Sequence, residues 1–180
     1  MGAKVHIFSQ LENFFAPKMF YFTFFHYICT MNKIEVRKYV LEQNKLHSEE
    51  EMNTLSQQIC EKILKHNAVM EANTIVLFWS MKDEVDTHEL VAKLVRKKNI
   101  ILITQSADIP PVIPPSDAVI IVPCLAYDSK GNRLGKGKGF YDRYLSQLEE
   151  NYKIGICFPW QMVENIPTDS HDIGVNEVIY

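Results

Sequence analysis

Two hydrophobic patterns alternate along residues 31–180. Apolar residues at helical spacing predict helices at 33–43, 48–66 and 87–97, and a further helix is expected at 140–150. Unbroken apolar runs rich in β-branched residues predict buried strands at 74–79, 100–104, 118–122, 154–158 and 177–180. Because strands and helices alternate, we expect an α/β fold, a three-layer sandwich with a mostly parallel central sheet covered by helices on both faces.

Short-range signals mark where several of these elements begin and end. Ser48 is followed three residues later by Glu51, which is the spacing of a capping box, and Thr87 stands where it would cap the third helix. Four prolines make residues 105–117 a loop, and residues 128–132 have the composition of a turn.

Residues 1–30 differ in composition from the rest of the chain. Seven of the ten phenylalanines fall in this stretch, and Pro17, Lys18 and His26 interrupt its apolar run. A signal peptide or short membrane anchor is one interpretation, but the run is shorter than the roughly 20 residues that a membrane span needs. We favour an added leader ahead of Met31, and we expect a single α/β domain at 31–180 after an aromatic-rich extension at 1–30.

Composition narrows the functional classes. The 180 residues are 47% hydrophobic and 23% charged, which is typical of a folded soluble protein and excludes disorder throughout. The net charge of −3 disfavours a general polyanion binder, so we expect no nucleic-acid partner, and we also expect no membrane association. Four widely spaced cysteines predict reduced, mostly buried thiols in a cytoplasmic protein, not a zinc site or a disulfide framework.

The candidate chemistry concentrates between residues 130 and 143. Four of the seven glycines and five cations fall here: Gly131, Gly135, Gly137, Gly139, Lys130, Arg133, Lys136, Lys138 and Arg143. Glycines let the backbone approach a ligand closely, successive amides can bind an anion, and the helix expected at 140 adds its dipole. The pattern predicts a phosphate-binding loop that is neither a Walker A motif nor G-x-G-x-x-G. The alternative is a flexible surface hairpin with solvated lysines.

Four blocks of sequence carry a resemblance to a known family. The longest runs from Val122 to Leu145 and contains the glycine-rich loop. The others are Lys33-Ile-Glu-Val-Arg37, Met81-Lys-Asp-Glu-Val-Asp-Thr87, and Ile166-Pro-Thr-Asp-Ser-His-Asp172 ahead of Val175-Asn-Glu-Val178. The order of the four blocks along the chain is that of the 5-formyltetrahydrofolate cyclo-ligases, also called methenyltetrahydrofolate synthetases. The chain resembles this family over most of residues 32–180.

The resemblance implies an ATP-dependent ligase. Members of this family convert 5-formyltetrahydrofolate into 5,10-methenyltetrahydrofolate and release ADP and phosphate, with Mg²⁺ as cofactor. The formyl oxygen attacks the γ-phosphate, N10 then closes the ring on the activated carbon, and phosphate leaves. The protein mainly has to position two substrates and stabilise phosphoryl charge, which suits a glycine-rich loop that carries lysines.

The same resemblance assigns roles to individual residues. The catalytic group is Arg133, Lys136 and Lys138. The ATP-binding set is Lys33, Arg37, Arg133, Leu134, Gly135, Lys136, Gly137, Lys138, Gly139, Phe140 and Tyr141. The folate-binding set is Met81, Glu84, Asp86, Lys136, Gly137, Lys138, Gly139 and Phe140. The expected Mg²⁺ ligands are Asp142 and Asp172, whose carboxylates are hard oxygen donors.

Structural alternatives exist for several of these residues. Lys33 and Arg37 lie one helical turn apart and could clamp polyphosphate together, or they could form a solvated helix face. Each of the two aspartates, taken without the family, is more often a helix cap or turn residue. Phe140 and Tyr141 could stack on the folate or on adenine. We expect Trp79 and Trp160 in the core or a pocket wall, and histidines at the surface at His47, His66 and His88.

One region departs from the family pattern. Members usually carry a few dozen extra residues that help to build the folate pocket between the strands at 100–104 and 118–122, whereas only residues 105–117 remain here. The main hypothesis is an active cyclo-ligase for 5-formyltetrahydrofolate and ATP that is a monomer or weak homodimer. The alternatives are a degenerate ATP- or folate-binding relative with little turnover, and a different phosphotransfer enzyme that shares the loop.

Overall fold

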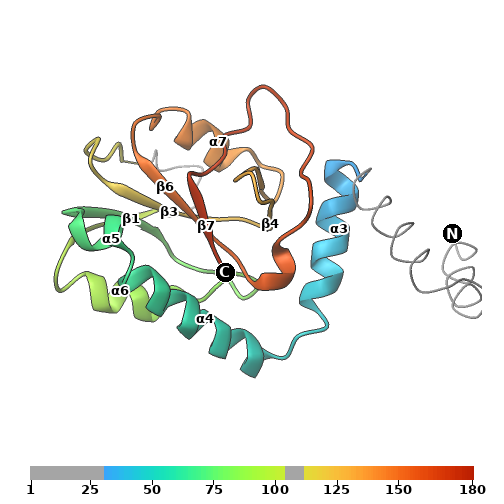
Figure 1. The fold of residues 1–180 in the computed structure, drawn as a ribbon, viewed down its shortest axis with the longest axis horizontal. Coiled ribbons are helices and arrows are strands. Elements are labelled where there is room, and N and C mark those ends of the chain that lie inside the picture. Colours follow the sequence, from blue (N-terminus) through green and yellow to red (C-terminus); the bar gives the residue numbers. More distant parts are fainter. Residues whose placement is uncertain (1–30, 104–111) are drawn as a thin grey trace, which may run out of the picture.

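A computed structural model describes residues 31–103 and 112–180, whose fold is shown in Figure 1. The helices are α3 (Lys33–Asn44), α4 (Glu49–Leu64), α5 (Asn67–Glu71), α6 (His88–Leu94) and α7 (Phe140–Leu145), with a 3₁₀ turn, η1 (Pro159–Gln161). The strands are β1 (Thr74–Phe78), β2 (Asn99–Ile103), β3 (Val119–Pro123), β4 (Ala126–Tyr127), β5 (Arg133–Leu134), β6 (Tyr152–Ile156) and β7 (Glu177–Ile179). The leader proposed for residues 1–30 lies outside the described residues, as does most of the loop expected at 105–117.

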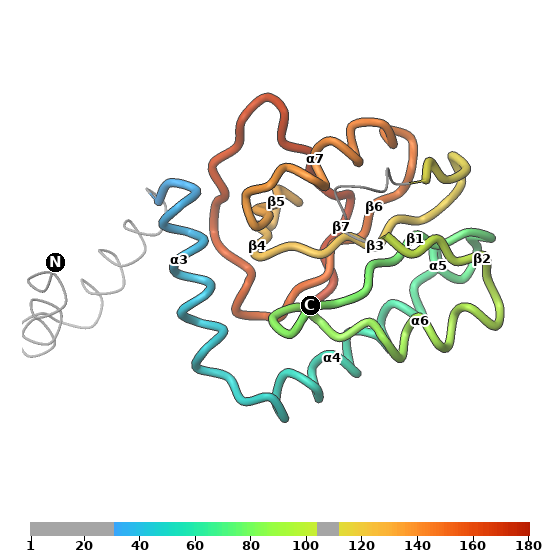
Figure 2. Tube along the Cα trace, turned by 180° about the vertical axis from the view of Figure 1, so that it is seen from behind, coloured from blue at the N-terminus to red at the C-terminus, as the bar shows by residue number. Residues whose placement is uncertain are grey.

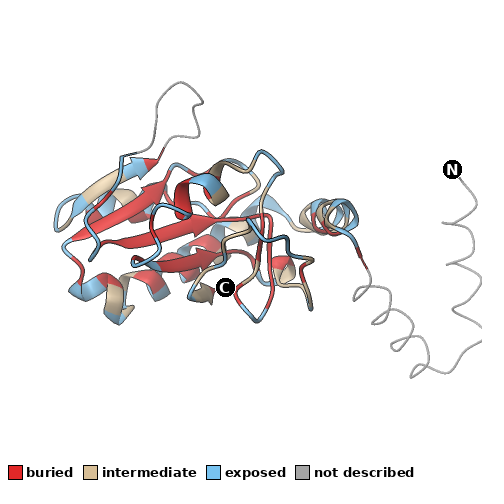
Figure 3. Cartoon of the chain, turned by 90° about the horizontal axis from the view of Figure 1, so that it is seen from above, coloured by how far each residue is buried: buried red, intermediate tan, exposed pale blue. Residues whose placement is uncertain are grey.

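The main sheet joins the strands in the order β2-β1-β3-β6-β7, and every neighbouring pair is parallel. The side chains of β1 and β3 are buried along the whole strand, whereas β2 at the edge of the sheet is partly exposed. The buried strands fill the centre of the molecule in Figure 3. The predicted parallel α/β sheet is confirmed.

Helices cover both faces of this sheet. α4, α5 and α6 lie on one face, where Ile63 and Leu90 belong to the same buried cluster as Ile75 of β1 (Figure 1). α7 lies on the other face, where Tyr144 packs in a cluster with Ile120 of β3. The three-layer arrangement follows from strands that are apolar on both sides and therefore need a helix on each face.

α3 belongs to neither layer and stands at the end of the sheet, beside β4 and β5 (Figure 2). Its buried side chains Val36 and Val40 share a small core with Leu125 and Leu134. The N-terminus of α3 is fixed by a capping box, in which Asn32 and Glu35 exchange side-chain and backbone hydrogen bonds. This placement brings the polar face of α3 to the carboxyl ends of the sheet strands.

β4 and β5 form an antiparallel hairpin of two-residue strands, of which the sequence predicts only the turn. Asp128 is fully buried, and its carboxylate accepts hydrogen bonds from the amides of Lys130 at 2.9 Å, Asn132 at 3.0 Å and Ile166 at 3.1 Å. Gly131 has a φ of +78°, which favours glycine. The turn expected at 128–132 is therefore confirmed, and it ties the hairpin to the C-terminal segment.

Two local predictions need correction. α7 ends at Leu145 rather than at 150, because the side chains of Ser146 and Gln147 donate to the carbonyl of Arg143 at 3.0 and 2.9 Å and compete for an acceptor that a longer helix would use. Thr87 stands at the start of α6 but does not cap it, since its hydroxyl donates to the carbonyl of Phe78 at 2.7 Å. Ser48 does cap α4, by accepting the amide of Glu51 at 3.2 Å.

The described residues hold no helix with the length and apolar character of a membrane span. Three of the four cysteines lie in this part of the chain, namely Cys60, Cys124 and Cys157, and each is buried and free. The prediction of reduced, buried thiols is confirmed for these three.

Gly155 of β6 offers a test of how tightly the sheet packs against the hairpin. A Cβ there would lie 2.6 Å from two ring carbons of Tyr127, which is fully buried and donates to the carbonyl of Val122 at 2.8 Å. We expect Gly155→Ala to lower the free energy of unfolding by about 1–3 kcal/mol in urea denaturation, because the ring has no room to move. Gly135→Ala is the control, since its Cβ would meet only a side-chain nitrogen of Arg133 at 3.4 Å. Equal losses in the two variants would contradict this expectation.

Candidate active site

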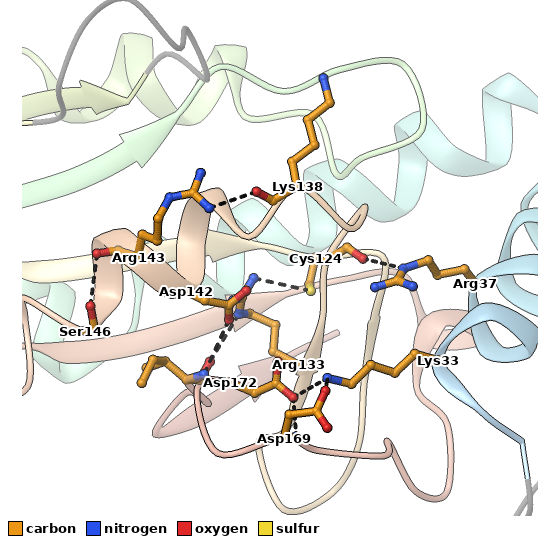
Figure 4. A network of polar contacts seen from close by, with 12 residues as sticks. Lys33, Arg37, Cys124, Arg133, Lys138, Asp142, Arg143, Ser146, Asp169 and Asp172 are labelled. Atoms are coloured by element: carbon orange, nitrogen blue, oxygen red, sulfur yellow. Dashed lines mark hydrogen bonds and ion pairs between the residues drawn. The ribbon is translucent and has the colours of Figure 1, made fainter.

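A buried ion pair joins the two ends of the glycine-rich loop (Figure 4). Arg133 of β5 is 5% exposed, and its Nη2 contacts Oδ1 of Asp142 in α7. Its Nε donates to the carbonyl of Ile173 at 3.2 Å, and its Nη1 lies 3.9 Å from the sulfur of Cys124. Arg133, a member of the predicted catalytic and ATP-binding sets, is therefore buried beneath the loop, where it positions Asp142.

The loop between these ends keeps its backbone open. The amides of residues 136–139 donate no hydrogen bond to any described residue. Gly137 and Gly139 have φ values of +95° and +62°, in the region that side chains other than glycine rarely adopt. Successive free amides in a turn of this kind can bind an anion, and residue 140 begins α7. Open amides of this kind are compatible with phosphate binding, which stays a prediction for this loop.

Arg37 of α3 lies over this loop. The Nε of Arg37 donates to the carbonyl of Gly135 at 3.0 Å, and its guanidinium lies 3.6–3.8 Å from the place where a Cβ on Gly137 would stand. The Nη groups of Arg37 have no hydrogen-bond partner among the described residues, so they remain available as donors to an anion. Glycine at 137 thus serves two needs, a positive φ and room for the guanidinium.

Lys33, one turn earlier on α3, bridges two carboxylates. Its Nζ lies 2.5 Å from Oδ2 of Asp172 and 2.6 Å from Oδ2 of Asp169. Burial alone would lower the pKa of Lys33, but the bonds to the two aspartates raise it above its usual value. For Asp172 burial alone would raise the pKa, but the hydrogen bonds from Lys33 and from the amide of Asp169 hold the pKa below its usual range. Both groups are therefore charged at neutral pH.

The predicted metal ligands lie close to this bridge. Asp169, His171 and Asp172 bring their ligand atoms within 4.8 Å of one another, and they are the one such group in residues 31–103 and 112–180. Asp142 is not a member, but its Oδ1 accepts the amide of Ile173, next to Asp172, at 3.4 Å. An ammonium already lies on the carboxylates of Asp169 and Asp172, which shows that the position accepts a cation.

Lys136 connects the loop to the segment that follows β1. Its Nζ lies 3.0 Å from Oδ1 of Asp83 and 3.2 Å from Oε1 of Glu84. Burial lowers the pKa of Lys136, but the two carboxylates outweigh it and raise the value. Lys138 is exposed, points away from the contact network in Figure 4, and makes no ion pair with a described residue. Its carbonyl is held by Nη1 of Arg143 at 3.0 Å.

Besides Arg133, two further members of the predicted ATP-binding set lie inside the protein. Leu134 packs in the small core under α3, so only its backbone can face the loop. Tyr141 is also buried, with its ring 5.8 Å below the guanidinium carbon of Arg133 and edge-on to Phe140, so it is not free to stack on a ligand. The hydroxyl of Tyr141 is buried without a partner in the described chain, and burial raises its pKa.

A cavity of about 790 Å³ opens between the α3–α4 connection and residues 80–88. The predicted folate-binding residues Met81, Glu84 and Asp86 all line it, together with Asp83, which contacts Lys136. The cavity and the glycine-rich loop are thus neighbours, since Asp83 and Glu84 border both. Its volume falls within the usual range for small-molecule sites.

The acidic residues of this segment differ in what they can offer a ligand. Glu84 is buried, and both its oxygens are engaged, by Lys136 and by the amide of Met81 at 3.0 Å. Asp86 is half exposed, and its Oδ1 accepts the amide of His88 at 2.8 Å, which supplies the α6 cap expected from Thr87. Oδ2 of Asp86 has no hydrogen bond within the described residues, so it is the freer acceptor.

Two residues of the site were missed at the level of sequence. Asp83 and Asp169 each hold a lysine of the predicted ATP-binding set. A signal for Asp83 exists, since it is one of three acidic residues in the block 81–87, opposite a loop with five cations. Two histidines are less exposed than expected: His47 stacks on Trp160 with ring centroids 3.5 Å apart, and His66 contacts Glu177 at 3.0 Å.

Comparison with known proteins supports one family. The sequence model of the 5-formyltetrahydrofolate cyclo-ligase family matches residues 29–110 and 110–180. The chain is 29% identical to 5-formyltetrahydrofolate cyclo-ligase of Mus musculus over 174 positions, which cover 74% of this chain and 85% of the mouse protein. It is 28% identical to the enzyme of the same name from Escherichia coli (strain K12), over 72% of this chain and 90% of that protein.

Two solved structures share the fold. One is 5,10-methenyltetrahydrofolate synthetase of Aquifex aeolicus, with a TM-score of 0.70 and 29% identity, covering 83% of this chain and 89% of that one. The other is a 5,10-methenyltetrahydrofolate synthetase from Mycoplasma pneumoniae, with a TM-score of 0.71 and 25% identity, covering 83% and 98%. The two matched segments of the family model meet at residue 110, inside the region 105–117 identified from sequence as shortened.

The ion pairs of the loop differ in burial, and this difference is testable. Asp142→Ala leaves the buried guanidinium of Arg133 without its carboxylate, so we expect a loss of about 3 kcal/mol in the free energy of unfolding. Asp83→Ala removes a half-exposed pair and leaves Lys136 paired with Glu84, so it should cost under about 1 kcal/mol. Urea denaturation without added metal or nucleotide measures both. A small loss in both variants would show that the buried pair does not hold the loop.

Proposed function

The chain belongs to the 5-formyltetrahydrofolate cyclo-ligase family, and we propose that its glycine-rich loop binds the phosphates of MgATP while the adjoining cavity binds the folate. The family's reaction converts 5-formyltetrahydrofolate to 5,10-methenyltetrahydrofolate and releases ADP and phosphate. One observation carries the assignment of the site. The free amides at 136–139 lie beside Arg37, whose Nη groups have no partner among the described residues. Lys136 of the same stretch contacts Asp83 and Glu84, which line the cavity together with Met81 and Asp86.

The chemistry explains why such a site is needed. A formyl group bonded to nitrogen has a weakly nucleophilic oxygen and a poorly electrophilic carbon. Transfer of the γ-phosphoryl group to that oxygen forms an O–P bond and breaks the bond to ADP, so the oxygen becomes a good leaving group. N10 then attacks the formyl carbon, and the C–O bond breaks as phosphate departs. Both steps depend on alignment of the two substrates and on neutralised phosphoryl charge.

The phosphate end of the site has groups for that task. The amides of residues 136–139 donate no hydrogen bond to a described residue, so they can donate to γ-phosphate oxygens. Lys138 carries a charge with no competing carboxylate, and Arg37 has free Nη donors above Gly137. In the free protein Lys136 pairs with Asp83 and Glu84 at the border of the cavity. From this position its ammonium can contact the phosphoryl group during its transfer to the folate.

The residues around Lys33 fit a magnesium ion. Asp172 offers a hard oxygen donor with Asp169 and His171 beside it, and Lys33 now neutralises Asp169 and Asp172. Asp142 offers its Oδ2, since its Oδ1 is held by Arg133. Asp142 and Asp172 would hold a magnesium ion, which when bound would neutralise part of the negative charge of the nucleotide phosphates. Lys33, once released from the aspartates, has its own charge available for the nucleotide.

The folate end relies on carboxylates and an apolar wall. The pterin presents its 2-amino group and a ring N–H as paired donors, which a carboxylate accepts well. Asp86, with Oδ2 free, suits this contact better than Glu84, which is already bonded through both oxygens. Met81 offers a half-exposed apolar surface in the same cavity for the ring face.

A second candidate is a relative that binds ATP or folate with little turnover. The observation that favours it is the interruption of the family match at residue 110, in a region that helps to build the folate pocket in family members. Incubation of the protein with 5-formyltetrahydrofolate and MgATP separates the two functions. The cyclo-ligase produces the methenyl absorbance and one ADP per product, whereas the binder shows heat of binding in calorimetry and no ADP.

Lys138 is the sharpest single test of the phosphate site. We expect Lys138→Ala to lower kcat/KM by about 10²–10³-fold, because it removes an uncompensated positive charge from the loop proposed to bind the phosphates. The fold should persist, since the side chain is exposed and its ammonium makes no contact with a described residue. Lys130→Ala, an exposed lysine of the hairpin turn, is the matched control and should keep wild-type rates. Wild-type turnover of Lys138→Ala with an unchanged circular dichroism spectrum would remove Lys138 from the site.

A further inference from the structure

Lys33 of α3 is held against two carboxylates on the segment between η1 and β7. Its Nζ lies 2.5 Å from Oδ2 of Asp172 and 2.6 Å from Oδ2 of Asp169. Figure 4 shows the three side chains converging from the helix and from this segment. The side chain of Asp169 is 59% exposed, whereas that of Asp172 is only 15% exposed. Asp172 is therefore the inner anchor of the lysine, and Asp169 is the outer one.

A tight turn brings these two carboxylates together. The amide of Asp169 donates to Oδ2 of Asp172 at 2.7 Å, and the amide of Asp172 donates to the carbonyl of Asp169 at 3.1 Å. The oxygen of Asp172 that accepts this amide also accepts the ammonium of Lys33. Because neighbouring carboxylates repel each other, the turn needs a cation between them, and Lys33 supplies it from a distant part of the chain.

Arg37, one turn further along α3, shows that a cation on this helix face does not need such partners. Its Nε donates to the carbonyl of Gly135 at 3.0 Å, and it forms no ion pair with a described residue. Of the two cations, only Lys33 is neutralised. The flexible stem of a lysine lets its ammonium move between partners while the helix stays in place, and the capping box of Asn32 and Glu35 fixes this end of α3.

Lys33 engages a carboxylate to which the proposed function assigns the magnesium ion. Both cations need oxygens of Asp172, and Mg²⁺ requires its oxygen ligands at about 2.0–2.1 Å. An ammonium and a dication on the same carboxylate repel each other, so each weakens the binding of the other. The aspartates therefore hold a metal ion well only after the ammonium has left them.

We propose that Asp169 is a positioning residue that keeps Lys33 on Asp172 until a nucleotide binds, so that the site takes up its metal ion together with the nucleotide and not before it. The inference rests on the proposed function, in which Lys33 belongs to the phosphate site. The phosphates offer the ammonium a new anion, and the carboxylates that it leaves become available to a metal ion. Binding of metal and nucleotide is therefore coupled through one lysine, and each raises the affinity for the other.

Titration with a divalent cation in the absence of nucleotide tests the role of Lys33. Mn²⁺ replaces Mg²⁺ at carboxylate ligands, and its free concentration is read from its electron paramagnetic resonance signal. We expect Lys33→Met to bind Mn²⁺ alone about ten-fold more tightly than the wild-type protein does, because both carboxylates lose their ammonium. Lys38→Met makes the same substitution at an exposed position of α3 and is the control, which should keep the wild-type affinity for Mn²⁺.

Asp169→Asn tests the positioning residue itself. The amide keeps the size of the side chain but loses the charge that holds Lys33, so ATP added with EDTA should bind about three- to ten-fold more tightly than it binds the wild-type protein. A residue that only supports the local fold would weaken this binding when it is replaced. Glu42→Gln, at an exposed position of α3, makes the same change in net charge and should leave the affinity unchanged.

Neither experiment involves turnover, so this inference and the proposed function can fail separately. Equal affinities of the wild-type protein and Lys33→Met for Mn²⁺ overturn the inference, and so does a failure of both proteins to bind it. Unchanged or weaker ATP binding by Asp169→Asn overturns the role of Asp169. In each case the cyclo-ligase activity of the wild-type protein is still decided by product formation. A wild-type protein that forms no methenyl product, but whose variants show both shifts in affinity, overturns the proposed function and leaves the role of Asp169 standing.

Discussion

The buried ion pair between Arg133 and Asp142 is the contact on which the site depends. It joins β5 to the first turn of α7, so the loop between them begins and ends at fixed points. The loop cannot hold itself, because its amides make no hydrogen bonds to described residues and its glycines allow many backbone conformations. A buried guanidinium needs further acceptors besides its carboxylate, and the carbonyl of Ile173 supplies one. The same pair thus fixes the loop to the C-terminal segment that carries Asp172.

The cationic side chains around this loop are of two kinds, those paired with carboxylates and those without such a partner. Lys33 and Lys136 each lie between two carboxylates, so their charges are compensated in the free protein. Arg37 and Lys138 have no carboxylate partner among the described residues. A site that binds three or four phosphate charges must gather cations that repel one another when it is empty, and acidic partners relieve that repulsion. In the proposed function, the unpaired cations attract the nucleotide, and the paired lysines exchange their carboxylates for phosphate when it binds.

The parts of the fold that local patterns encode could be predicted. Buried parallel strands are continuous apolar runs, so the sheet and its alternation with helices follow from the sequence. The helical spacing of Lys33 and Arg37 placed them on one face, and the structure brings both to the site. The glycine pattern of 135–139 indicated an open loop, and positive φ values occur at Gly137 and Gly139.

The rest depended on contacts between distant residues. The burial of Arg133 follows from the packing of α7 and the C-terminal segment around it, which no spacing within the loop reveals. Lys33 meets Asp169 across 136 positions of sequence, so its partner could not be read from a local pattern. Thr87 has the position of a helix cap, but it is buried beside the end of β1, where its hydroxyl donates to the carbonyl of Phe78 and accepts no helix amide. Its hydroxyl satisfies that carbonyl, and the exposed Asp86 takes over the cap.

That exchange has a functional consequence. With Thr87 bonded to residues on both sides of Trp79, the end of β1 cannot move independently of the start of α6. Asp86 and His88 flank Thr87. The carboxylate in the cavity and the ring of His88, which stacks on Trp79, therefore share one rigid support. The glycine-rich loop has a support of its own in the Arg133–Asp142 pair, and the two supports meet where Lys136 contacts Asp83 and Glu84.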